Sequence, residues 1–283
     1  MRYFLFLDSL RWYVRLPLKV LVALLAVTLV TFPYPQILIK NIEHWQDPNA
    51  LVDAESASIQ PLIESLQPEI QALSNDHEKI LKTVERKVYE VVPYDWDWNT
   101  WGTADYMPTV EEVMAMGRED CDGRAVVAAS VLRNFGYDAR LVTDFSHVWV
   151  TTEHGDTMGP GKQKAIEGGK KGVSVNLSGL VQMPQALAFG VAVFPLEREL
   201  ILVAVFWWLS LRRRGGALIA VMSLLLLANG LMFLRAGGAD FRSPERLLQW
   251  LGILNLVVAV ILLWIVQFRQ VRRAEADISA LSA

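Results

Sequence analysis

The stretch Arg118-Glu119-Asp120-Cys121-Asp122-Gly123-Arg124-Ala125 decides the fold of the middle of this chain. Cys121 is the single cysteine among 283 residues, and it stands where a loop is expected to become a helix. His147 follows 26 residues later in Ser146-His147-Val148-Trp149-Val150, a run whose residue types indicate a strand. A cysteine at a helix start and a histidine on a neighbouring strand are the arrangement expected of a nucleophile and its base.

The sequence around this stretch predicts a mixed α and β unit. Apolar residues recur at three- and four-residue spacing where helices are expected, and Val, Trp and Thr alternate where strands are expected. Thr109 and Glu112 form a capping-box pattern, and Gly117 ends that short helix. Pro61 and Pro68 are expected to break the first helix into pieces. The predicted helices cover 54–73, 75–92, 109–117 and 121–135, and the predicted strands 138–143, 147–152 and 173–177.

The ionisation of Cys121 depends on opposing charges. The free N–H groups and the dipole of a helix N-terminus stabilise a thiolate. Asp120 and Asp122 oppose this, because a nearby like charge raises the pKa of a thiol. A partner histidine, His147, would favour the thiolate through a thiolate–imidazolium pair. Arg124 is expected to pair with the acidic run.

Two residues compete for the third role, which is to orient the imidazole. A tight hairpin at His154-Gly155 would leave Asp156 roughly 20 Å from His147, at about 3.4 Å per strand residue. If 153–172 is instead one long loop, the strand 173–177 returns beside 147–152 and brings Asn176 next to His147. Asn176 is therefore the preferred third member, and Asp156 is the weaker alternative. A zinc site made of Cys121, His147 and His154 lacks the paired-ligand spacing of structural sites.

Several runs in this region resemble one known family. They are Tyr94-Asp95-Trp96-Asp97-Trp98 with Trp101-Gly102, Pro108 to Gly117, Asp120 to Ala125, Leu132 with Gly136 to Val142, and His147-Val148-Trp149-Val150. Through these runs residues 80–180 are similar to the transglutaminase-like superfamily, including the bacterial transglutaminase-like cysteine proteinases. Cys121 and His147 match that family's cysteine and histidine, whereas Asn176 stands where the family has aspartate.

The resemblance implies an α+β, papain-like fold with a catalytic triad and with no cofactor or metal. It implies a cysteine hydrolase or acyltransferase, meaning a protease, amidase or transamidase, acting on a protein or peptide substrate. The membrane anchor that we expect for this enzyme lies outside the resemblance. The departure at Asn176 leaves an alternative open. In that alternative the domain is catalytically silent and serves as a peptide- or protein-binding or assembly module at the membrane.

Apolar residues make up 53% of the chain and the mean hydropathy is +0.28, both high for a wholly soluble protein. They concentrate at 18–39 and at 186–267, which indicates transmembrane α-helices on both sides of a soluble domain. Pro33 and Pro35 stand where a signal peptide would be cleaved, so the first segment is expected to stay as an anchor. A net charge of −3 argues against a nucleic-acid partner.

We therefore expect a basic segment and anchor at 1–40, an extracytoplasmic domain at 41–185, about three transmembrane helices at 186–270, and a cytoplasmic tail at 271–283. The shortest predicted span, 200–211, has 12 residues. Positive residues gather beside the spans on one side, which puts both termini inside. In a bacterium with two membranes the protein would be a multi-pass inner-membrane protein with a periplasmic domain. Such a protein could bind another membrane protein as a partner.

Overall fold

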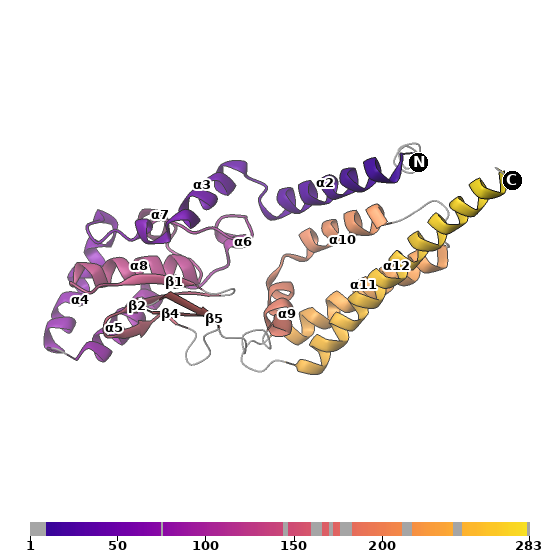
Figure 1. The fold of residues 1–283 in the computed structure, drawn as a ribbon. Coiled ribbons are helices and arrows are strands. Elements are labelled where there is room, and N and C mark those ends of the chain that lie inside the picture. Colours follow the sequence, from indigo (N-terminus) through magenta and orange to yellow (C-terminus); the bar gives the residue numbers. More distant parts are fainter. Residues whose placement is uncertain are drawn as a thin grey trace. The chain divides into compact units, whose positions relative to one another are not determined.

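The computed structural model describes residues 10–74, 76–143, 147–159, 166–169, 172–175, 183–210, 217–239 and 245–281. Contacts divide the chain into two compact units, each described by itself below. One unit is 31–180, and the other is 1–30 together with 181–283. Both consist mainly of helices, and the described strands all belong to the first (Figure 1).

The unit 31–180 is an α+β domain. Its helices are α3 (Pro35–Gln46), α4 (Gln60–Ala72), α5 (His77–Val91), α6 (Asp97–Thr100), α7 (Val110–Met116) and α8 (Cys121–Asn134), with 3-10 helices η1 (Pro48–Leu51) and η2 (Ala57–Ile59). Its strands are β1 (Arg140–Thr143), β2 (Val148–Thr152), β3 (Gly155–Thr157), β4 (Ile166–Gly169) and β5 (Gly172–Val175). The expected α+β fold class is confirmed.

Helix α8 is the centre of this domain's core. Every side chain from Ala125 to Leu132 is buried, and α8 contacts α4, α5, α7, β1 and β2. A helix covered on all faces needs apolar residues all round, which Ala125-Val126-Val127-Ala128-Ala129 provides. The exception, Ser130, is satisfied because its hydroxyl donates to the Val126 carbonyl (2.8 Å) and accepts from the Asp53 N–H (3.1 Å). This packing fixes the position of the helix start, where Cys121 lies.

Helices α7 and α4, which precede α8 in the chain, can be compared with the sequence predictions. The capping box of α7 is present, with Thr109 and Glu112 each accepting from the other's backbone N–H, and Gly117 ends the helix with a φ of 69°. The predicted break at Pro68 is wrong, because α4 continues through Pro68 to Ala72. Pro61 lies in the first turn of α4, where its missing N–H would have had no partner within the helix.

The main sheet has three strands in the order β1-β2-β3, all antiparallel. β2 and β3 form a hairpin around Glu153 and His154, with Thr152 opposite Gly155. The predicted long loop over 153–172 and the return of strand 173–177 beside 147–152 are therefore wrong. Both edges of β2 are already paired, and β5 pairs with β4 in a separate two-stranded sheet.

The second unit holds the apolar helices. They are α2 (Trp12–Thr31), α9 (Met183–Val193), α10 (Leu196–Ser210), α11 (Ala217–Gly238) and α12 (Arg246–Leu281). Among the described residues, three helical segments are long and apolar enough to cross a membrane: Tyr13–Thr31, Leu218–Gly238 and Arg246–Leu263. α10 has 15 residues, fewer than the about 20 that span the hydrocarbon layer at 1.5 Å per residue.

Contacts at its two ends place α10 antiparallel beside α2. The Lys19 ammonium donates to the Leu209 carbonyl, and Arg198 donates to the Val30 carbonyl at 3.1 Å. Arg235 lies in the last turn of α11. It pairs with the buried Glu199 of α10, so its charge is neutralised within this unit.

Candidate active site

Cys121 is the first residue of α8, as the sequence predicts. The carboxylate of Asp120 caps the helix by accepting from the Asp122 N–H at 3.2 Å. A parallel bridge between Tyr94 and Glu119 holds the preceding segment. In this bridge the Glu119 N–H donates to the Pro93 carbonyl (3.1 Å), and the Glu119 carbonyl accepts from the Asp95 N–H (3.2 Å). The tryptophan-rich segment after Pro93 is thereby tied to the start of α8.

Four carboxyl groups surround this helix start: Asp97, Glu119, Asp120 and Asp122. One oxygen of each lies within 4.8 Å of one oxygen of every other. All but Asp120 are buried, and Glu119 is completely inaccessible to solvent. Carboxylate oxygens are the ligands that hard cations prefer. Within the described part of the chain, these four residues are the group that could hold a metal ion.

Hydrogen bonds and shared protons stabilise this cluster. The indole N–H of Trp101 donates to both oxygens of Glu119, at 3.1 and 3.0 Å. Burial raises the pKa of Asp97 far above its usual range, and the charges of Asp120 and Glu119 raise it further. Asp97 Oδ2 accepts from the Tyr106 N–H (2.7 Å), but no described group hydrogen-bonds to its buried Oδ1. Asp97 therefore keeps its proton, which makes it a donor toward Glu119.

Asp122 behaves in the same way. Burial raises the pKa of Asp122 well above its usual value. The charge of Asp120 and a hydrogen bond to the Asp120 side chain raise it further. The absence of a side chain at Gly123 is also required here. A Cβ at that position would lie 2.1 Å from Cγ of Glu119 and 2.9 Å from Pro108. The Asp-Gly pair after Cys121 thus fits the carboxyl cluster sterically.

The Cys121 thiol is neutral in this setting. Burial of the sulfur raises its pKa, and the charge of Asp120 raises it further. The N–H groups of Val148 and of Cys121 itself lower the pKa, but less than burial and charge raise it. The thiolate expected at a helix N-terminus is therefore not present at neutral pH. The contribution of Val148 also places the start of β2 beside the sulfur.

His147 immediately precedes β2, at that same end of the strand. Its Nε2 lies 2.8 Å from the main-chain carbonyl oxygen of Met158, just after β3. Because a carbonyl oxygen accepts and cannot donate, Nε2 carries a hydrogen, and in the neutral ring Nδ1 is the nitrogen without one. The Val148 N–H beside the Cys121 sulfur belongs to the residue that follows His147, so the N-terminus of α8 lies next to the start of β2.

The two candidate third residues lie in different situations. Asp156 is exposed on β3, opposite Thr151 in the strand register. Thr151 is four residues along β2 from His147, which corresponds to roughly 13 Å. Asn176 lies outside the described residues, and the pairing of β5 with β2 on which we based it does not form.

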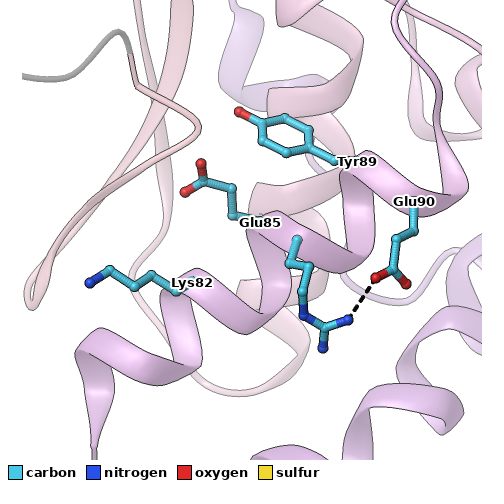
Figure 2. A pocket seen from close by; sticks show the side chains of 5 residues that line it. Lys82, Glu85, Tyr89 and Glu90 are labelled. Carbon is cyan, nitrogen blue, oxygen red and sulfur yellow. Dashed lines mark hydrogen bonds and ion pairs between the residues drawn. The ribbon is translucent and has the colours of Figure 1, made fainter.

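An open groove of about 490 Å³ runs along the outer face of α5. Figure 2 shows Glu85 and Tyr89 projecting from the same side of that helix, where they line the groove with Lys82, Arg86 and Glu90. An ion pair of 2.7 Å joins Arg86 to Glu90.

Tyr89 connects this groove to the first turn of α8. The guanidinium of Arg124 in the first turn of α8 lies 4.8 Å from the centre of the Tyr89 ring and 5.0 Å from that of Tyr94. Arg124 thus stacks on aromatic rings and donates to the Val92 carbonyl (2.8 Å), rather than forming the ion pair we expected with the acidic run.

Comparison with known families agrees with this geometry. Residues 64–159 match the model of the transglutaminase-like superfamily, a segment that runs from α4 through β3. The chain contains a transglutaminase-like domain. Searches of curated proteins and of solved structures gave no significant match. The resemblance that we assigned from Cys121, His147 and their neighbours is thereby confirmed at the level of the superfamily.

Several residues of this transglutaminase-like domain were not foreseen from sequence. Asp97 and Trp101 lie about twenty residues before Cys121, and only the Tyr94–Glu119 bridge brings them to it. The signal that the sequence offered was the high content of Trp and Asp in the segment between Pro93 and Gly102. Met158 contacts His147 through its backbone carbonyl, so the type of its side chain could not indicate this contact.

The Asp97→Asn variant tests the protonated carboxyl. Since the folded-state pKa is raised, the folded protein retains a proton that the unfolded chain loses above about pH 4. The free energy of unfolding of the wild type therefore falls as pH rises from there. Asparagine mimics the protonated acid, so the variant should be more stable than wild type at pH 9 and little different at pH 4.

Thermal unfolding of the full chain in detergent, followed by tryptophan fluorescence, measures this difference. The exposed Asp138→Asn variant is the control, and it should follow the wild type at both pH values. An Asp97→Asn variant that loses the same stability at pH 4 and pH 9 would show that Asp97 is ionised in the folded state.

Proposed function

We propose that the transglutaminase-like domain is a cysteine-dependent acyl-transfer enzyme that acts on amide bonds of a protein or peptide. The observation that carries the proposal is the Val148 N–H at the Cys121 sulfur, directly after His147, whose ring is held at Nε2. A neutral thiol fits a mechanism in which the histidine removes the proton as the reaction begins.

In the first step, Nδ1 of His147 accepts the proton of the Cys121 thiol while the sulfur attacks the carbonyl carbon of the substrate amide. The resulting imidazolium then donates that proton to the amide nitrogen, and the C–N bond breaks. A thioester to Cys121 remains. Water releases the acyl group in a protease or amidase, and an amine releases it in a transamidase.

The groove on α5 supports an extended polar substrate. It lies on one face of α5 and carries both charges, from Lys82 and Arg86 and from Glu85 and Glu90. Tyr89 and Arg124 lead from this groove toward the first turn of α8. A peptide or protein segment lying in the groove would bring its backbone amides toward Cys121.

A second candidate function is a catalytically silent module that binds a peptide or protein partner at the membrane. The raised pKa of the Cys121 thiol favours it, since a buried neutral thiol among carboxyl groups is a poor nucleophile without a base. The two functions share the groove but differ in what happens at the sulfur.

The first test is acetylation by p-nitrophenyl acetate, a general acyl donor. The full chain in detergent micelles should release p-nitrophenolate and gain one acetyl group on Cys121, detected by intact mass. Cys121→Ala should abolish both signals. His147→Ala should slow acetylation on the order of 10²–10⁴-fold, the usual contribution of a general base.

His77→Ala is the matched control, since His77 lies on α5 and bonds to Tyr137 instead. It should acetylate at the wild-type rate. If the Cys121→Ala variant releases p-nitrophenolate as fast as wild type, the enzyme proposal fails and the binding module remains.

We further propose that the domain lies on the outer side of a bacterial inner membrane, where it can meet a membrane-protein partner. The antiparallel contacts of α10 with α2 support α10 as a fourth, short span, reached through local thinning of the bilayer. Four spans place ten basic residues beside the membrane on the inner side. Only three lie in the outer loop region, and one of these, Arg235, is paired.

Single cysteines in a Cys121→Ala background test this topology. A membrane-impermeant maleimide should label the Glu78→Cys variant in spheroplasts and the Ser282→Cys variant only after permeabilisation. Labelling of Ser282→Cys in sealed spheroplasts would contradict the four-span arrangement. Labelling of Glu78→Cys only after permeabilisation would place the domain inside.

A further inference from the structure

We propose that Glu85 of α5 is a positioning residue for His147 and that it acts through the backbone of Met158. This inference rests on the proposed function and adds to it the group that orients the imidazole. The main-chain carbonyl of Met158 takes the ring-holding role for which the sequence suggested a side chain at 176 or 156.

The first step is the bond between the ring and the carbonyl. At 2.8 Å, the Met158 carbonyl oxygen holds Nε2–H of His147 and fixes the tautomer in which Nδ1 is unprotonated. A backbone carbonyl is a common partner for the second nitrogen of a functional histidine. It sets the orientation and the tautomer, while giving less charge stabilisation to the imidazolium than a carboxylate would.

The second step is the backbone conformation of Met158. Its φ is 61°, in the left-handed region that non-glycine residues rarely adopt, and its side chain is only 3% exposed. Such a conformation is unfavourable for a non-glycine residue and persists only where neighbouring contacts stabilise it. Something must therefore hold the chain just after β3 in this conformation.

The third step identifies Glu85 as that contact. Its Oε2 accepts from the Thr157 hydroxyl at 2.9 Å and lies 3.5 Å from the Met158 backbone N. Thr157 is buried, and its hydroxyl also lies 3.4 Å from the Leu81 carbonyl. The contacts of Glu85 thus tie the end of β3 to α5, immediately before the carbonyl that holds His147. Glu85 itself touches none of the reacting atoms.

Acetylation kinetics of Glu85 and Thr157 variants test this chain of contacts. Glu85→Ala and Thr157→Val should each lower the maximal acetylation rate by about 10- to 100-fold with the half-saturating ester concentration little changed, as expected when a base is misplaced by about 1 Å. Glu85→Gln should restore most of the lost rate, because its amide oxygen still accepts from Thr157. Glu78→Ala, an exposed change on the same helix, should match wild type.

The ring tautomer gives a readout that does not require catalysis. Solid-state ¹⁵N and ¹³C spectra of histidine-labelled full-length protein in lipid should show His147, assigned by its loss in His147→Asn, protonated at Nε2. Glu85→Ala should give a mixture of tautomers.

A wild-type ring protonated at Nδ1 would overturn the inference even if Cys121 is acetylated. The inference would also be overturned if Asn176→Ala lowered the maximal acetylation rate more than 100-fold while Glu85→Ala left that rate unchanged. If instead Cys121→Ala acetylates like wild type, the proposed function fails, while the tautomer still decides whether Met158 holds the ring.

Discussion

The burial of Glu119 and Asp122 on either side of Cys121 is the constraint on which the domain depends. Neither carboxyl can be left in the core without partners, so each needs a specific neighbour. Glu119 accepts hydrogen bonds from the indole N–H of Trp101 and from the protonated Asp97, and Asp122 is hydrogen-bonded to Asp120. The partners of Glu119 come from the loop after Pro93, which the bridge to Glu119 aligns with the helix start, whereas Asp120 is the N-cap of α8 itself.

The same constraint sets the state of the nucleophile. A helix N-terminus alone would favour a thiolate, yet burial and Asp120 leave the sulfur protonated. The chemistry then depends on a base that is held in one orientation. The structure provides it through a backbone carbonyl at the end of β3, supported by α5. A membrane-anchored enzyme of this kind would react only when substrate brings a carbonyl group to the sulfur.

Much of this arrangement could be predicted from local sequence signals. Thr109 and Glu112 specified α7, the apolar run after Gly123 specified α8, and the alternation around Trp149 specified β2, because each signal acts within a few residues. The positions of Cys121 at the start of α8 and of His147 before β2 followed from the same local patterns. Pro68 misled the prediction because tertiary packing of α4 outweighs the loss of one hydrogen bond.

The features that were predicted wrongly, or not predicted at all, depend on contacts between segments that are distant in the sequence. Nothing local in Gly155-Asp156-Thr157 showed that β3 would occupy the edge of β2 and displace the strand around Asn176. Asp97 reaches Glu119 only through a bridge across more than twenty residues, and Met158 contributes an atom common to every residue. Side-chain patterns therefore predicted Cys121 at the start of α8 and His147 before β2, but missed the buried carboxyl cluster and the carbonyl that holds the ring.

The pH dependence of Cys121 alkylation by iodoacetamide tests the central claim most directly, because Cys121 is the only thiol in the chain. If burial and Asp120 keep the thiol protonated, alkylation of the full-length protein at pH 7 is slower than that of a free model thiol, whose pKa is about 8.5. The rate then rises only at a pH above that value. Rapid alkylation at pH 7 that does not change with pH would show a standing thiolate–imidazolium pair and contradict the account.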